Sequence, residues 1–166
     1  MTGFARMRLP GAIAMTMVLA VGVAAPVVAE MDEVLAEELV GVEQAKLESW
    51  YGQASTDAYI DDVAEDATYF DPWVPAKQYG PAVVEYLKGF EGMIPPLGFE
   101  ITDASADVRG DVAIFTYNVE NYDQETGDPA GLWMVTKVMN RSGDDWEVIH
   151  IHYGAPLPPP EAPAAE

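Results

Sequence analysis

The chain has 166 residues, with 28 acidic and 8 basic side chains, no cysteine, and a formal net charge of −20. A surface this acidic repels phosphate backbones and anionic lipid, which argues against nucleic-acid and membrane-surface partners. The chain cannot form a disulfide, so packing or oligomerisation must stabilise the fold.

The first 29 residues are typical of an export signal. Arg6 and Arg8 form a basic start, residues 12–25 form an apolar centre, and small residues lead up to Ala29. The apolar stretch is too short and too rich in alanine and glycine for a membrane span. We therefore expect cleavage after Ala29 and a periplasmic or secreted protein without membrane contact. Removal of two basic and no acidic residues would bring the net charge to −22.

Three helices are predicted in the first half of the mature chain. Apolar residues recur there at helical spacing, and residues that favour helix starts precede each stretch. The predicted spans are Asp32–Ala54, Asp57–Glu65 and Gly80–Phe90. A short strand, Ala67–Phe70, separates the second helix from the third and is followed by a proline-containing loop.

Four β-rich segments follow, separated by short stretches with turn residues. They are Phe99–Val108, Val112–Tyr122, Leu132–Asn140 and Trp146–Tyr153. Consecutive strands joined by hairpins predict an antiparallel meander, and helices placed mostly before it predict an α+β fold with helices on one side of one sheet. Because both faces of the later strands are partly apolar, we expect a second subunit to cover the outer face.

The sequence predicts a single domain over residues 30–156. It lies between the signal peptide at residues 1–29 and a tail at residues 157–166. The tail is rich in proline and alanine and carries acidic residues, so we expect it to be extended and without a core.

Three segments resemble the NTF2-like superfamily, which includes SnoaL-like proteins, ketosteroid isomerase and the association domain of calcium/calmodulin-dependent protein kinase type II. They are EDATYFDP at Glu65–Pro72, GPAVVEYLKGF at Gly80–Phe90 and DDWEVIHIHYGAP at Asp144–Pro156. The resemblance implies a cystatin-like cone in which a curved antiparallel sheet wraps the long first helix and two short ones. It also implies a pocket at the open end and a homodimer or higher homo-oligomer formed through the outer face.

Asp71 is the main candidate for a general base. It follows an apolar strand, where partial loss of water makes proton uptake by a carboxylate easier. In the ketosteroid isomerases, the acid of the Asp-Pro pair that Asp71 resembles removes a proton next to a carbonyl. The resemblance therefore implies that role for Asp71.

The chain departs from that family where donors for a developing oxyanion are expected. The position of the family's first-helix tyrosine falls near Leu47, and that of its second acid near Thr136 or Lys137. Tyr51 and Tyr59 are the candidate replacements. The arginines of the kinase association domain are also missing, which argues against an anionic ligand of that kind.

His150 and His152 are the only histidines, and they alternate on the last strand so that both leave the same face. One interpretation is a proton shuttle, which adds both to the candidate catalytic residues. A second is half of a metal site, for which Asn118 and Glu120 would have to supply further ligands. A third is a structural role at an interface; we predict no metal and no cofactor.

A small, mostly apolar organic ligand is the expected occupant of the pocket, since the chain carries more aromatic residues than a small core needs. The candidate ligand-binding residues are Trp50, Tyr51, Tyr59, Trp73, Asn118, Glu120 and Trp133. Three functions stay open: a ligand-binding protein, a cofactor-free isomerase, dehydratase or cyclase that uses Asp71 as base, and an oligomerisation module.

Overall fold

The computed structural model describes residues 30–156. The predicted signal peptide and tail lie outside the described residues. Within residues 30–156, no helix is long and apolar enough to cross a membrane.

Three helices form within residues 30–156, and the longest starts and ends at residues suited to those positions. Asp32 caps α1 (Glu33–Gln53) because its Oδ1 accepts the backbone N–H of Leu35 at 2.9 Å. Ala54 ends the helix in the left-handed region, with φ 50°. The others are α2 (Asp57–Ile60) and α3 (Pro81–Lys88), which has proline in its first turn.

The second helix is shorter than the sequence predicts. It ends at Ile60, and the residues from Val63 onward belong to strand β2 (Val63–Phe70) instead. Val63 pairs with Val148 of the last strand, and Ala64 is 4% exposed. A ladder in the sheet therefore replaces the expected last helical turn, because tertiary pairing outweighs the weak local preference for helix.

The strands of the described part of the chain form one seven-stranded sheet in the order β1-β4-β5-β6-β7-β2-β3. Besides β2 they are β1 (Glu30–Met31), β3 (Gln78–Tyr79), β4 (Gly98–Arg109), β5 (Val112–Tyr122), β6 (Pro129–Ser142) and β7 (Asp145–Gly154). The antiparallel meander β4-β5-β6-β7 confirms the prediction. β2 joins it in parallel along β7, so the sheet is mixed rather than wholly antiparallel.

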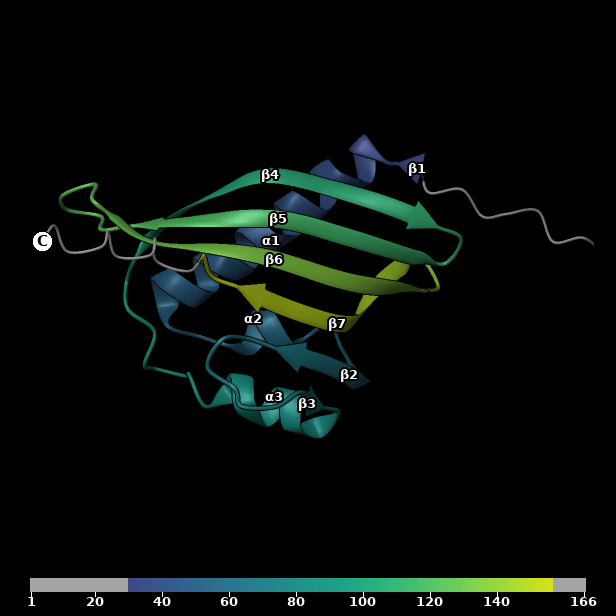
Figure 1. The fold of residues 1–166 in the computed structure, drawn as a ribbon, viewed down its shortest axis with the longest axis horizontal. Coiled ribbons are helices and arrows are strands. Elements are labelled where there is room, and N and C mark those ends of the chain that lie inside the picture. The colour runs from purple at the N-terminus through teal and green to yellow at the C-terminus, as the bar shows by residue number, and fades with distance from the viewer. Residues whose placement is uncertain (1–29, 157–166) are drawn as a thin grey trace, which may run out of the picture.

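The sheet curves, and α1 crosses one of its faces while α3 lies beyond β2 (Figure 1). We call the face toward α1 the inner face and the opposite one the outer face. On β5 the two alternate: Ala113, Phe115, Tyr117, Val119 and Asn121 are buried on the inner face. The core lies between this face and α1, which agrees with the predicted α+β cone.

A bulge in β7 changes its predicted alternation. The ladder with β6 shifts between Val138 and Met139, which pair with His150 and Val148, so that Ile149 has no partner. Val148 therefore joins Ile151 in the core, with exposures of 0% and 1%, although alternation places the two on opposite faces.

Candidate functional site

A cavity of about 670 Å³ opens between α1, α3 and the inner face of the sheet. Its wall is mostly apolar and aromatic, with a few polar side chains. Of the residues predicted for the site, those that line it are Trp50, Tyr51, Tyr59, Asp71, Trp73 and Trp133.

Asp71 is held at the cavity wall by four hydrogen-bond donors. Oδ1 accepts the backbone N–H groups of Trp73 and Val74 at 2.7 and 2.9 Å. Oδ2 accepts the hydroxyls of Tyr69 and Tyr86 at 3.0 and 2.6 Å. Asp71 is 9% exposed, and each of its oxygens already accepts two hydrogen bonds.

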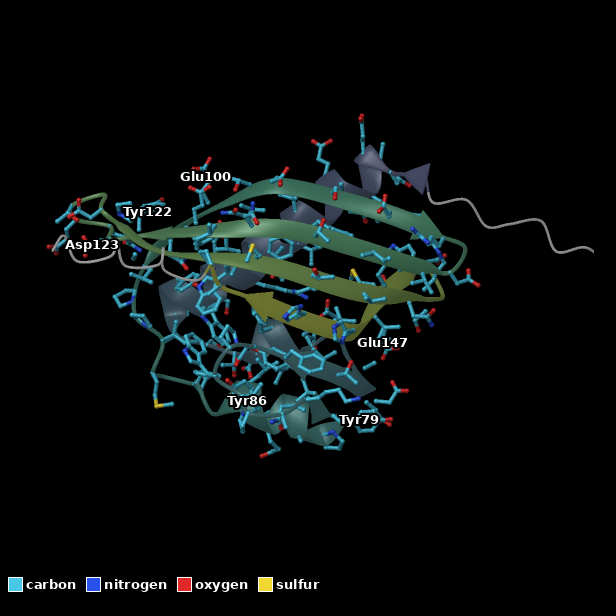
Figure 2. All side chains as sticks on the ribbon, in the orientation of Figure 1. Tyr79, Tyr86, Glu100, Tyr122, Asp123 and Glu147 are labelled. Carbon is cyan, nitrogen blue, oxygen red and sulfur yellow. The ribbon has the colours of Figure 1, made fainter. Side chains whose placement is uncertain are left out.

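The tyrosine donors come from two elements. Tyr69 belongs to β2, and Tyr86 lies on α3, near the lower edge of the molecule in Figure 2. Burial raises the pKa of Tyr86, and the hydrogen bond to Asp71 raises it further. The pKa of Tyr69 is raised mainly by burial as well, and both hydroxyls therefore keep their protons and donate to Asp71.

A chain of hydroxyl groups leads from the cavity to a buried ion pair. Tyr59 and Tyr153 both line the cavity, and their hydroxyls are hydrogen-bonded to each other. Tyr59 Oη donates to Glu43 Oε1 at 2.8 Å, and Lys137 Nζ lies 2.6 Å from Glu43 Oε2. Because Tyr59 has one hydroxyl proton and gives it to Glu43, Tyr153 must be the donor to Tyr59.

The ion pair is almost completely buried, with side-chain exposures of 2% for Lys137 and 3% for Glu43. Burial would raise the pKa of Glu43, but the positive charges of Lys137 and Lys46 outweigh it and keep that pKa below its usual value. Lys137 also lies 4.8 Å from the centre of the Tyr59 ring. Lys46, in turn, is paired with Asp62.

A second polar group lies elsewhere on the cavity wall. Tyr51 Oη donates to Asn121 Oδ1 at 3.1 Å, and Asn121 Nδ2 donates to the Gly98 carbonyl at 3.4 Å. Both side chains line the cavity. The amide of Asn121 is thus fixed by its neighbours.

His150 and His152 share one face, as predicted, and it is the outer one. Phe70, at 40% exposure, lies edge-on to both rings, with centroids 5.8 and 6.0 Å away. Thr68 Oγ1 lies 2.6 Å from His150 Nδ1. Neither histidine lines the cavity. Burial, followed by the charges of His152 and Lys77, lowers the pKa of His150.

Asn118 and Glu120 also lie on the outer face, because side chains alternate along β5 and it is Val119 and Asn121 that point to the cavity. Glu120 accepts a hydrogen bond from Thr102 there, at 3.2 Å. The polar residue of β5 that reaches the cavity is Asn121. Within residues 30–156, no three His, Asp or Glu side chains form a group that could hold a metal ion.

The sequence interpretation missed several residues of the site. Tyr69, Tyr86, Tyr153 and Glu43 are not among the candidates that the sequence suggests. The signal for Glu43 was present in its position, because it lies four residues before Leu47 and therefore on the buried stripe of α1.

Comparisons with known proteins agree with this architecture. A model of the SnoaL-like domain matches residues 44–158. Among curated proteins, no sequence relative matches. A putative ketosteroid isomerase from Parabacteroides distasonis is 26% identical, with a TM-score of 0.64 over 76% of this chain and 91% of that one.

Two further solved structures share the fold at lower identity. An NTF2-like protein of unknown function from Pseudomonas putida is 21% identical, with a TM-score of 0.65 over 78% of this chain and 92% of that one. The CaMKII hub of S. rosetta is 20% identical, with a TM-score of 0.58 over 73% and 96% of the two chains. Because the family model covers most of the chain and the fold is the same, the protein belongs to the SnoaL-like family of the NTF2-like superfamily.

Proposed function

We propose that the protein binds a small, mostly apolar organic ligand in the cavity, without catalysing a reaction. The observation that carries this proposal is the cavity itself. Its volume of about 670 Å³ lies in the usual range of small-molecule sites, and its wall combines apolar and aromatic side chains with a few fixed polar groups.

The state of Asp71 favours binding over catalysis. A general base needs a lone pair directed at the proton it removes. Both oxygens of Asp71 already accept two hydrogen bonds, so that proton removal would require at least one donor to leave. Tyr59 and Tyr153 donate toward Glu43, which leaves neither proton directed at a developing oxyanion in the cavity.

A cofactor-free isomerase, dehydratase or cyclase is the second candidate. It is favoured by the position of Asp71, which lies in the cavity wall beside tyrosine hydroxyls. The relative of 26% identity described as a putative ketosteroid isomerase supports the same candidate. His150 and His152 would not take part, since they lie on the outer face.

Oligomerisation through the outer face is part of the proposal. Phe70 and Met134 expose apolar side chains, at 40% and 46%, and the hub and association domains among the structural neighbours suggest self-assembly. An oligomerisation module without a ligand stays the third candidate. Residues 1–29 support export to the periplasm or outside the cell.

A variant that fills the cavity tests binding. Ile94 lines the cavity and is 9% exposed, so Ile94→Trp should occupy space that the ligand needs. Val42→Trp adds the same side chain on α1 outside the cavity and is the matched control. Native mass spectrometry of protein from its own host should find a retained small molecule in the wild type and in Val42→Trp, and none in Ile94→Trp.

Two results would count against this function. A ligand retained equally by Ile94→Trp would place binding outside the cavity. Turnover of a carbonyl compound that Asp71→Asn abolishes, with ligand retention unchanged, would favour the isomerase, dehydratase or cyclase instead.

A further inference from the structure

The cavity is surrounded by aromatic rings that contact one another. Trp73 and Trp133 meet edge to face with ring centroids 4.9 Å apart, and Trp133 lies 6.2 Å from Tyr153. Tyr153 is 6.0 Å from Tyr69, which donates to Asp71. Each ring carries partial negative charge on its faces, so such a group attracts a cation.

The charges near the cavity do not cancel. Glu43 is neutralised by Lys137 and Asp62 by Lys46. Among the described residues that line the cavity, Asp71 is the one carboxylate and none is a lysine or an arginine. The ionised groups around the cavity therefore leave a net negative charge, and that charge belongs to Asp71.

The hydroxyl protons of the site are also committed. Tyr69 and Tyr86 donate to Asp71, and Tyr153 and Tyr59 donate in sequence to Glu43. Tyr51 donates to Asn121. Within residues 30–156, an anionic ligand would therefore meet a negative charge and no free tyrosine hydroxyl in the cavity wall, whereas a buried anion needs positive charge or hydrogen-bond donors.

We propose that the ligand is an organic cation: a quaternary ammonium group joined to an apolar body. This inference rests on the proposed ligand-binding function. The oxygens of Asp71 already accept four hydrogen bonds, so the site suits a cation that has no N–H to donate. The ammonium interacts with Asp71 through charge and with the aromatic rings through cation–π attraction.

The rest of the cavity and the rest of the protein fit the same ligand. Leu47, Leu87 and Val119 provide an apolar wall for the body of the molecule. The net charge of −20 gives the surface a negative potential, which raises the local concentration of cations and speeds their association.

A pair of isosteric probes tests the charge. Benzyltrimethylammonium and neopentylbenzene differ by nitrogen against carbon at one atom, so they match in shape and differ in charge. Binding would be followed by quenching of tryptophan fluorescence. We expect the cation to bind the wild-type protein at least tenfold more tightly than the neutral probe.

Two variants assign the preference to the site. Asp71→Asn should reduce the advantage of the cation over the neutral probe to about threefold or less. Saturable binding of neopentylbenzene to this variant shows that the cavity is intact. Trp133→Leu removes a ring without changing the charge and should weaken binding of the cation more than that of the neutral probe.

The outcomes separate this inference from the proposed function. Equal binding of both probes, or tighter binding of neopentylbenzene, overturns the organic cation and leaves the ligand-binding function standing. An advantage of the cation that persists in full in both variants also overturns it. Failure of both probes to bind, together with no retained ligand in native mass spectrometry, contradicts the proposed function itself.

Discussion

Two buried carboxylates, Glu43 and Asp71, are stabilised in different ways. Glu43 lies beneath the cavity, between α1 and β6, and is paired with the ammonium of Lys137 at 2.6 Å. Asp71 lies in the cavity wall and accepts four hydrogen bonds from neutral groups. The first is a charge balanced by a charge, and the second is a charge surrounded by dipoles.

Because of this difference, one core can hold a neutralised ion pair and still present a charge to a ligand. Pairing cancels the field of Glu43 at the cavity, while dipoles stabilise Asp71 without removing its charge. The ion pair is therefore structural, and the net charge is left at the wall. Substitutions that affect only one of the two carboxylates can test this difference in charge balance.

The largest effect is expected from Lys137→Met. The substitution keeps most of the side-chain volume and leaves Glu43 buried without its cation, which should lower the free energy of unfolding by about 3–5 kcal/mol. Chemical denaturation followed by circular dichroism measures it. The double variant Lys137→Met and Glu43→Gln, which keeps an acceptor for Tyr59, should recover most of the loss. A double variant as unstable as the single one would show that packing, and not charge, explains the effect.

Asp71→Asn should have a smaller effect, about 2 kcal/mol, because it weakens hydrogen bonds to a charged group without leaving an unpaired charge. The amide oxygen can still accept the two backbone N–H groups. Tyr86→Phe removes one of the four donors and should lower stability by about 1 kcal/mol. If Asp71→Asn lowered stability by as much as Lys137→Met, the contrast between the two carboxylates would be wrong.

Much of the fold could be predicted from the sequence, because local patterns determine it. The periodicity of α1 and the turn residues between the last four strands gave the helix and the meander. The pairing of β2 with β7 could not be found this way, since it joins residues about 80 positions apart, such as Thr68 and His150. The same pairing turned the expected end of α2 into strand.

The site was predicted in part for a related reason. The aromatic residues and Asp71 lie where composition and the Asp-Pro pair suggested. Side-chain direction depends on register, however, and one residue separates Glu120 on the outer face from Asn121 in the cavity. The bulge at Ile149 likewise brings Val148 into the core beside Ile151, which strict alternation cannot show.

Acid should act on the ion pair in a defined direction. The pKa of Glu43 is lowered in the folded protein from its ordinary value of 4.5, because Lys137 and Lys46 outweigh burial. Its contribution to stability is therefore complete above pH 4.5 and is lost as the pH falls toward the folded pKa, by at most about 1.4 kcal/mol per pH unit.

Comparison with a variant that lacks the pair isolates this contribution from the many surface carboxylates. The stability difference between the wild type and the Lys137→Met, Glu43→Gln double variant should shrink between pH 5 and about pH 3. A difference that stays constant over this range would mean that folding does not lower the pKa of Glu43, which would contradict a stabilising ion pair with Lys137.

The smallest expected effect is a gain, from Tyr117→Phe. Tyr117 is 2% exposed, and its hydroxyl has no hydrogen-bond partner among the described residues. Burial raises the pKa of Tyr117, and the negative charge of the nearby Glu43 raises it further. Removing a buried hydroxyl without a partner should raise stability by about 1 kcal/mol. Tyr59→Phe is the matched control and should lower stability by about 1–3 kcal/mol, because it takes the donor from Glu43 and the acceptor from Tyr153. Equal losses in both variants would show that Glu43 depends on the hydroxyl of Tyr117 as much as on that of Tyr59.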